Sequence, residues 1–430
     1  MSRKLSSIFY GWWIVTASFF LLVFAGGTAL YGFTAFFNPI SEEMGFSSAL
    51  TSLGFSLRSM EGGVIQPAIG FLIERVGIRN CILAGLAIEA LGLFLLSRLT
   101  GIPTFYIGFI LLSIGYTLSA GIPEYTAVAN WFRKRRGLAL GLTTAGFGFS
   151  GIMTPIFILM IHSVGWRSTL LILCPAILII CVPLTFVLRT RPESYGMRPD
   201  GAKPLVESPK ESGTVNGQKN VAGLTDEQGF TIKQCMAKRT FWLLMLYSFF
   251  TQFSGSAIQV LEMPHLINAG ISEDLAALTM VGITVGSVTG RLGFSWLGDI
   301  YSKKKLLIIA AIMQAIGVFI FAKISSPWMI IPFLLIYSPG YGAPIPLIPA
   351  IQADYFGTKA FASVRGLVSI GTALSGIIGP LFAGWLFDRS HTYSTAFIIY
   401  AVLATVAVPV MMMATVTRDN SPTKIGQILD

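Results

Sequence analysis

Residues 275–298 constrain the fold of this chain more than any other stretch. These 24 residues contain a single charged side chain, Arg291. An α-helix rises ~1.5 Å per residue and the hydrocarbon core of a bilayer is ~30 Å thick, so the stretch is long enough to cross a membrane. Asp299 and the lysines at 303–305 follow it and mark its aqueous end. The stretch therefore predicts a membrane-spanning helix that carries an arginine.

Arg291 lies eight residues before Asp299, which places it ~12 Å deeper and close to the bilayer midplane. Inserting a charged arginine there costs at least ~2.5 kcal/mol, and the guanidinium stays protonated. Arg291 therefore needs an anion or a water-filled cavity. Ser287 lies one turn earlier on the same helical face. We interpret Arg291 as a fixed cation for an anionic substrate; the alternative is a structural ion pair with a carboxylate of a neighbouring helix.

Long apolar stretches recur along the whole chain. Its 430 residues are 53% hydrophobic and only 12% charged, a composition typical of polytopic membrane proteins. We predict an all-α membrane protein with twelve transmembrane helices, so that both termini lie on one side of the bilayer. The predicted spans are residues 10–37, 49–73, 81–96, 103–128, 138–161, 169–188, 241–265, 275–298, 306–322, 328–353, 366–387 and 396–416.

Lysine and arginine are distributed unevenly between the two sides of these spans. On the side of the termini lie 24 of the 30 basic residues, including Arg365, and four lie in the opposite loops. The positive-inside rule then predicts cytoplasmic termini, in a multi-pass protein of the plasma membrane, here a bacterial inner membrane. Because the basic residues follow the loops, the net charge of +10 does not indicate nucleic-acid binding.

Residues 190–237 differ from the rest of the chain, because they are rich in proline, glycine, serine and charge. We predict a cytoplasmic linker that is mostly disordered. It separates a six-helix bundle at residues 1–189 from a second one at 238–417, and residues 418–430 form a cytoplasmic tail.

The two halves repeat short motifs at one offset. Residues 70–74 correspond to 295–299 at an offset of 225, and residues 150–155 to 375–380 at the same offset. Residues 129–132 match 353–356 at an offset of 224. Such repeats predict two pseudo-symmetric bundles related by an axis along the membrane normal, with a substrate site between them near the midplane.

The loop after residue 70 carries a family motif. Gly70-x-x-x-Glu74-Arg75-x-Gly77-x-Arg79 resembles the signature of the major facilitator superfamily, and Asp299 with Lys303 and Lys304 resembles its degenerate second copy. The resemblance covers nearly all of the chain outside the linker and tail, and it implies the twelve-helix fold of that superfamily.

This motif suggests a cytoplasmic gate. We expect Glu74 to cap or pair with a neighbouring basic loop, and the arginines to join the two halves. In the second copy Ser295 replaces glycine and Ile300 replaces arginine, so we expect a weaker junction there. The expected gate residues are Glu74, Arg75, Arg79, Asp299, Arg135 and Arg136.

Two further motifs narrow the resemblance. Gly11-Trp12-Trp13 and the motif of residues 131–146 resemble the first-span and fifth-span signatures of the monocarboxylate transporters and the related oxalate/formate antiporters. The monocarboxylate family binds the substrate carboxylate with an arginine of the eighth span, and Arg291 occupies that place. Animal-type members carry an aspartate where this chain has Ser287, and oxalate-type antiporters carry a lysine in the eleventh span, of which residues 366–387 contain none. One deep cation, with Arg58 as a possible second, fits a monoanion better than a dianion.

Other charged residues inside the spans are candidates for proton coupling or gating. Arg58 and Glu61 are three residues apart, so they could neutralise each other, or Glu61 could bind a proton because burial disfavours its charge. Glu124 lies on a span that usually lines the cavity in this fold, and we consider it for coupling or gating. Glu89 lies on a usually peripheral span, so we interpret it as structural, and Glu262 lies near the outer surface, so we assign it no role.

Polar side chains within the spans should face the protein interior rather than lipid. We therefore expect several of them to shape the substrate site beside Arg291 and Ser287. These residues are Tyr31, Tyr116, Gln252, Gln259, Tyr337 and Tyr341.

No Walker A loop, nucleophile elbow or His-Glu-x-x-His motif occurs, and the three histidines lack metal-ligand spacing. We therefore expect no enzyme activity, no cofactor and no metal site. The sequence predicts a monomeric secondary transporter of a small organic anion, a monocarboxylate like lactate or pyruvate, carried with a proton across the lipid bilayer. The alternatives are a small-carboxylate antiporter of the oxalate/formate type and a non-transporting membrane sensor.

Overall fold

The computed structural model describes residues 9–46, 65–201, 229–390 and 392–415. Nearly all of this part is helical, and it contains eleven helices that are long and apolar enough to cross a membrane. Most of the predicted span at 49–73, including Arg58 and Glu61, lies outside the described residues, although residues 65–76 are helical. The expected all-helical membrane fold is confirmed.

The first bundle precedes residue 190. Its helices are α2 (Gly11–Gly26), α3 (Phe37–Met44), α5 (Ile78–Ser97), α6 (Ile102–Ser119), α7 (Ile122–Trp131), α8 (Arg136–Phe149), α9 (Met153–Val164) and α10 (Trp166–Val187), with the helix at 65–76 preceding α5. Short π-helical and 3-10 turns connect α2 to α3 and α8 to α9.

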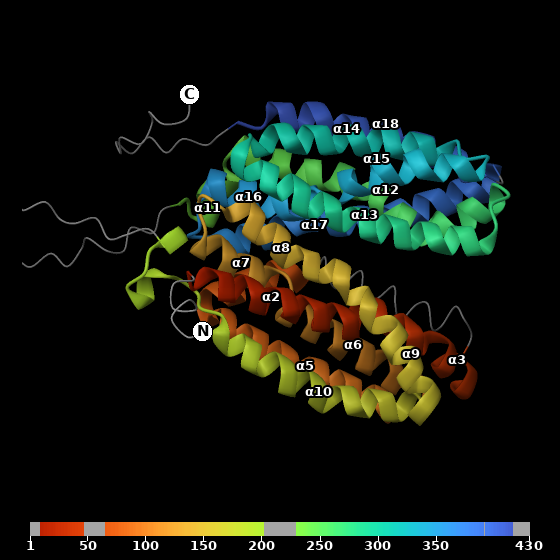
Figure 1. Cartoon of the computed structure of the whole chain (residues 1–430), viewed down its shortest axis with the longest axis horizontal. Helices are drawn as coiled ribbons and strands as arrows, with labels where there is room; N and C mark the ends of the chain where they lie inside the picture. The colour runs from red at the N-terminus through yellow and green to blue at the C-terminus, as the bar shows by residue number, and fades with distance from the viewer. Residues whose placement is uncertain (1–8, 47–64, 202–228, 391, 416–430) are drawn as a thin grey trace, which may run out of the picture.

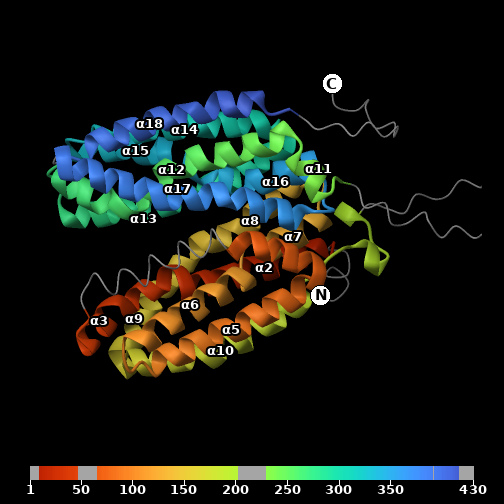
Figure 2. The ribbon, with the colours of Figure 1, turned by 180° about the vertical axis from the view of Figure 1, so that it is seen from behind.

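The second bundle follows the short helix α11 (Ile232–Met236). Its helices are α12 (Arg239–Asn268), α13 (Glu273–Ile300), α14 (Lys303–Ala322), α15 (Ile330–Gly342), α16 (Pro344–Phe356), α17 (Phe361–Ser390) and α18 (Ser394–Met413). Figures 1 and 2 show the two bundles as separate layers, red to yellow below and green to blue above.

One predicted span is broken in the middle. Residues 103–128 form α6 and α7, which are separated at Ala120 and Gly121. Gly121 has a φ of +95°, a conformation that favours glycine because it has no Cβ. Backbone groups freed inside a membrane are tolerated only where protein or water covers them. The break places Glu124 in the first turn of α7, within the protein interior.

The internal repeat is visible in the way each bundle closes. Arg79 donates hydrogen bonds of 2.6 Å to the carbonyls of Leu188 and Phe186 at the end of α10. Its counterpart Lys304, 225 residues later, donates from Nζ to two carbonyls at the end of α18, at 2.8 and 2.7 Å. A cation in this position satisfies carbonyls that lack helical partners. Arg79 therefore joins helices of its own bundle rather than the two halves, in contrast to our expectation.

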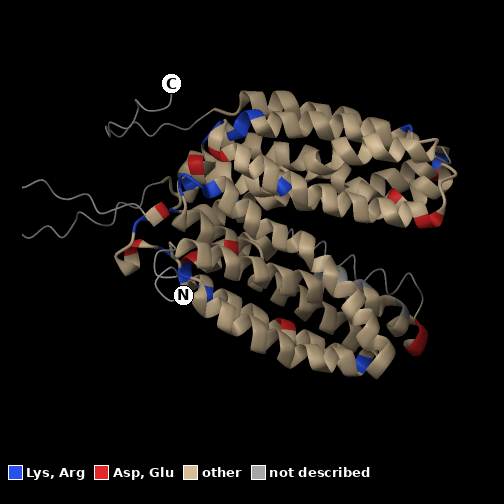
Figure 3. Cartoon of the chain, in the orientation of Figure 1, with Lys and Arg blue, Asp and Glu red and all other residues tan. Residues whose placement is uncertain are grey.

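The two bundles meet at one end and diverge toward the other (Figures 1 and 2). The meeting end is where α2 begins and α18 ends, and we call it the termini end. Basic residues gather there (Figure 3). Gly137 and Gly141 allow α8 to approach α13 closely: a Cβ at Gly137 would lie 2.5 Å from the carbonyl oxygen of Ser295. Small residues at such crossings let helix backbones pack in direct contact.

Candidate functional site

Arg291 projects from α13 to the junction between the bundles. Its side chain is buried, and Nη1 donates a 2.7 Å hydrogen bond to the carbonyl of Thr144 in α8. Its Nε is enclosed and has no hydrogen-bond partner among the described residues. Ser287, one turn earlier, is also buried and donates to the carbonyl of Thr284. Arg291 therefore presents a charged group with spare N–H donors at the interface of the two halves.

A structural ion pair for Arg291 finds no support in the described part of the chain. No carboxylate of residues 9–46, 65–201, 229–390 or 392–415 lies within ion-pairing distance of its guanidinium. Its recorded polar partner is a neutral carbonyl in the other bundle. A neutral carbonyl offsets the burial of a cation less than a carboxylate does, so the described residues compensate the charge of Arg291 only in part.

Four of the expected polar residues lie together in the second bundle. Gln259 of α12 donates a 2.6 Å hydrogen bond to the hydroxyl of Tyr341 in α15, and the rings of Tyr337 and Tyr341 stack at 5.7 Å. Gln252 borders a cavity together with Tyr341. The other two lie in the first bundle: Tyr116 is half-buried with its ring 6.5 Å from that of Phe147, and the side chain of Tyr31 is outside the described atoms.

Two buried carboxylates of the first bundle, Glu89 and Glu124, differ in the hydrogen bonds that they accept. Glu89 accepts hydrogen bonds from the hydroxyls of Thr28 (2.7 Å) and Ser119 (3.1 Å). Glu124 is completely buried, and neither of its carboxylate oxygens has a hydrogen-bond partner among the described residues. An unpaired carboxylate in such surroundings is far more stable when it carries a proton.

The first junction between the bundles surrounds the start of α8. Asp299 accepts hydrogen bonds from the backbone amides of Gly137 (2.7 Å) and Leu138 (2.8 Å). Arg136 pairs with Asp354 of α16 at 2.5 Å, and Lys303 holds the other oxygen of Asp354 at 2.8 Å. A carboxylate at a helix N-terminus satisfies orphan amides and interacts favourably with the helix dipole.

The second junction surrounds the start of α17. Glu74 accepts a 3.1 Å hydrogen bond from the amide of Ser363. It is thus the repeat counterpart of Asp299, but it holds one amide rather than two. We expected the junction at Asp299 to be the weaker one. The hydrogen bonds indicate the opposite, because the short Asp299 side chain lies directly over the first turn of α8 and accepts from two amides. Arg75 and Arg135 are exposed and make no recorded bond to the opposite bundle within the described residues.

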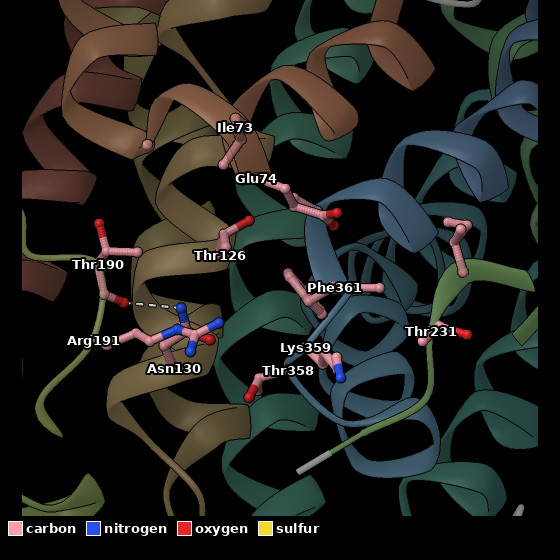
Figure 4. A pocket seen from close by; sticks show the side chains of 14 residues that line it. Ile73, Glu74, Thr126, Asn130, Thr190, Arg191, Thr231, Thr358, Lys359 and Phe361 are labelled. Carbon is pink, nitrogen blue, oxygen red and sulfur yellow. Dashed lines mark hydrogen bonds between the residues drawn. The ribbon is translucent and has the colours of Figure 1, made fainter. Parts of the chain in front are cut away.

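A cavity of about 560 Å³ adjoins the Glu74 junction at the termini end. Figure 4 shows Glu74 directed toward Phe361 at the start of α17, with Arg191 and Asn130 on the side of the first bundle. Asn130 donates a 2.9 Å hydrogen bond to the carbonyl of Thr190. Because both bundles line this cavity, its shape depends on their closure at this end.

Comparison with known proteins agrees with this architecture. The family model described as Major Facilitator Superfamily matches residues 19–266 and again residues 241–428. The chain belongs to the Major Facilitator Superfamily. The two successive matches correspond to the two halves that the internal repeat predicts.

Named members of the superfamily resemble this chain at low identity. Monocarboxylate transporter 12 of Rattus norvegicus is 24% identical over 404 residues, which cover 90% of this chain and 82% of that protein. The oxalate:formate antiporter of Oxalobacter formigenes is also 24% identical over 404 residues, covering 92% of this chain and 89% of that protein. The expected resemblance to both groups is confirmed.

Solved structures of the superfamily share the fold. The fucose:proton symporter of E. coli superimposes with a TM-score of 0.69 at 16% identity, covering 94% of this chain and 98% of that one. The human organic anion transporter MFSD10 gives a TM-score of 0.69 at 13% identity, covering 93% and 99%. These solved structures and this chain therefore share their fold.

Three charged residues escaped the sequence-based prediction. Arg365 was counted with the loops, yet it lies inside α17, with its guanidinium 5.9 Å from the ring centre of Tyr125 in α7. Asp354 was assigned no role, although its acidic side chain replaces Asn130 in a repeated motif, a difference that could have identified it. Glu262 was expected near the surface, but it is buried and its Oε1 has no hydrogen-bond partner among the described residues.

Proposed function

We propose that this superfamily member is a monomeric secondary transporter of a small monocarboxylate such as lactate or pyruvate. The observation that carries the proposal is Arg291, a buried guanidinium at the bundle interface with an unused Nε and no carboxylate partner among the described residues. The names of the relatives, a monocarboxylate transporter and an oxalate:formate antiporter, support a carboxylate as the cargo.

The arrangement of the bundles supports an alternating-access mechanism. We assign the termini end to the cytoplasm, because 24 of 30 basic residues lie on that side of the spans. The described conformation is then closed toward the cytoplasm and faces outward. A carboxylate that reaches Arg291 from outside would compete with the carbonyl of Thr144 for the guanidinium, because charge-assisted hydrogen bonds are the stronger ones. Loss of that inter-bundle bond would favour opening at the termini end.

We propose proton symport, with Glu124 as the proton-binding carboxylate. Moving one negative charge inward against a negative-inside potential costs ~2.3 kcal/mol per 100 mV. A proton carried with the anion removes this cost. Glu124 is buried with both oxygens unpaired, whereas the other candidates, Glu61 and Arg58, lie outside the described residues.

The test is uptake of labelled lactate, pyruvate, formate and oxalate into proteoliposomes, with and without an inward proton gradient. We expect gradient-stimulated monocarboxylate uptake that Arg291→Gln abolishes and Arg291→Lys partly restores. Arg389→Gln is the matched control, since this arginine of α17 contacts the ring of Trp385. Wild-type rates in Arg291→Gln would refute the assigned role of Arg291.

Exchange of small carboxylates is the second candidate, favoured by the similarity to the oxalate:formate antiporter over most of both chains. Uptake that requires carboxylate inside the vesicle and ignores the proton gradient would establish exchange. A transporter-like sensor would bind one of the four carboxylates without moving it in either assay.

A further inference from the structure

The cavity at the Glu74 junction is lined by both bundles and carries two basic side chains, Arg191 and Lys359. We call it the Glu74 cavity. We propose that it binds a phosphate-bearing anion from the side of the termini, and that the bound anion holds the two bundles closed at this end. The site is distinct from Arg291, which does not line this cavity.

The internal repeat shows what fills the equivalent place at the other junction. There the carboxylate of Asp354 lies between two cations, Arg136 at 2.5 Å and Lys303 at 2.8 Å. At the offset of 225, Phe361 at the start of α17 corresponds to Arg136 at the start of α8. At the offset of 224, Asn130 corresponds to Asp354. A phenyl ring and a neutral amide thus replace an ion pair, and both border the Glu74 cavity.

The two cations of the Glu74 cavity repeat the arrangement around Asp354 without its carboxylate. Arg191 follows the last helix of the first bundle, and Lys359 precedes α17 of the second. Figure 4 shows them on opposite sides of the cavity. At the junction around α8, an arginine of the first bundle and a lysine of the second likewise face one carboxylate. An anion between Arg191 and Lys359 would complete the same pattern across the boundary.

The acidic residue of the cavity is already engaged. Glu74 is directed toward the start of α17 (Figure 4) and accepts a 3.1 Å hydrogen bond from the amide of Ser363. A carboxylate in that position interacts favourably with the positive end of the helix dipole. Glu74 therefore stabilises the helix end, and the space beside the two cations is left for another negative group.

The size and lining of the Glu74 cavity indicate which anion fits. A phosphate monoester carries a charge of about −1.5 to −2 at pH 7 and three acceptor oxygens, so it can accept from two cations at once. Arginine matches phosphate with a planar pair of donors. Four threonines, at 126, 190, 231 and 358, add polar groups to the lining. The volume of about 560 Å³ lies in the range of ~300–1,000 Å³ typical of small-molecule sites and leaves room for an organic group on the phosphate.

Binding in this cavity has a conformational consequence. Since its walls come from both bundles, separating the bundles at the termini end would divide the site. A ligand that binds the closed form alone raises the ratio of closed to open molecules, by about elevenfold at ten times its dissociation constant. The anion would therefore slow any cycle that requires this end to open. This inference does not depend on which molecule is carried or on the role of Arg291.

The test measures binding to the full-length chain in phosphatidylcholine nanodiscs by equilibrium dialysis. The labelled probes are glucose 6-phosphate, inorganic phosphate and glucose, which lacks the phosphate. The variants are Arg191→Gln, Lys359→Gln and Asn130→Asp, and the last restores the carboxylate found at the repeat position. Lys305→Gln is the matched control, because this exposed lysine lies at the same end but does not line the cavity. Melting temperatures establish that each variant is folded.

We expect one glucose 6-phosphate bound per wild-type chain and per Lys305→Gln chain, and no binding of glucose. Each loss of a cation should weaken binding at least about tenfold, because charge-assisted hydrogen bonds are removed. Asn130→Asp should weaken it more, since its carboxylate repels the anion and takes its place between the cations. Spin-label distances across the termini end should show more closed molecules with the ligand in the wild type and no such response in Asn130→Asp.

The two phosphate probes distinguish the sources of the anion. Binding of glucose 6-phosphate at least about tenfold tighter than inorganic phosphate would assign the site to an organic phosphate, and equal affinities would assign it to inorganic phosphate. Absence of phosphate-dependent binding in the wild type, or wild-type affinity in both Arg191→Gln and Lys359→Gln, would overturn the inference. Binding that leaves the spin-label distances unchanged would overturn its conformational part. Loss of transport in Arg291→Gln, or its persistence, affects none of these outcomes.

Discussion

The two junctions that close the termini end are related by the internal repeat, yet they differ in how fully their charges are paired. At the α8 junction, defined by Arg136, Asp299 and Asp354, every one of these charged side chains has short polar contacts to the protein. At the α17 junction, defined by Glu74, Arg365 and the Glu124–Tyr125 pair of α7, Glu74 holds one amide, and Arg365 and Glu124 have no polar partner among the described residues.

This difference gives the two junctions different expected roles. A fully paired junction stabilises one conformation, and its strength does not depend on what is bound. A junction with an unpaired cation and an unpaired carboxylate is sensitive to whatever supplies the missing partner, whether an anion or a proton. We therefore expect substitutions in the α8 junction to change stability, and substitutions in the α17 junction to change coupling and ligand dependence.

The largest effect should follow from Glu124→Gln. It removes the proton site that we propose, so gradient stimulation of carboxylate uptake should fall to the level without a gradient. The melting temperature should change little. Glu89→Gln is the matched control, because it disturbs hydrogen bonds to Thr28 and Ser119 and should lower stability by ~1–3 kcal/mol. Full gradient stimulation in Glu124→Gln would remove this residue from the mechanism.

Arg136→Met should have the next largest effect. Breaking a buried ion pair costs ~3–5 kcal/mol, but Asp354 is partly exposed and keeps its bond to Lys303, so we expect a loss of about 2 kcal/mol. Melting of the purified protein measures it. Arg135→Met, an exposed neighbour, should melt like the wild type; equal melting of both variants would show that the pair does not stabilise the junction.

Asp299→Asn and Glu74→Gln compare the two junctions directly. Hydrogen bonds to charged groups contribute ~1.5–3 kcal/mol each, and asparagine retains one acceptor, so Asp299→Asn should reduce the closed population at the termini end by about tenfold. Glu74→Gln should reduce it less, because one amide is involved. Distances between spin labels on the two bundles measure the population. A larger effect of Glu74→Gln would reverse our ranking of the junctions.

The smallest predicted effect is a loss of stability in acid, and it concerns the far end of the first bundle, remote from both junctions. Glu43 of α3 accepts hydrogen bonds from Arg167 (2.9 Å) and Trp166 (2.5 Å), which hold the pKa of its carboxyl below the ordinary 4.5. A lowered pKa means that this stabilisation is present above pH 4.5 and is lost as the pH falls through the lowered value. The pair is exposed, so the loss should stay below about 1 kcal/mol.

Melting as a function of pH, with Glu43→Gln as the comparison, tests this effect. The variant should show a shallower decrease in acid than the wild type. Identical curves would mean that Glu43 contributes nothing to stability.

Much of this architecture could be predicted from sequence, because twelve apolar stretches and a 225-residue repeat leave few alternatives. The Asp299 and Glu74 positions followed from the repeated motif. Arg365 and Asp354 were missed for the same physical reason. A span predicted from hydropathy ends at the first charged residue, so both residues were placed just outside a predicted span. The helix α17 nevertheless begins at Phe361, where Glu74 caps its first turn, and this carries Arg365 into the interior.

Glu262 was misplaced for another reason. Counting residues from a loop estimates depth along a helix, but it does not tell which neighbours surround a side chain. Burial of Glu262 depends on how α12 packs within its bundle, and the order of residues in one helix does not contain that information.

The ties from Arg79 to α10 and from Lys304 to α18 have a mechanical consequence. Each fastens an early helix of its bundle to the last one. We expect these ties to resist shear within each bundle, so that motion is concentrated at the boundary between the two bundles. In the alternating-access mechanism that we propose, distances within a bundle would then stay nearly constant while those across the boundary change.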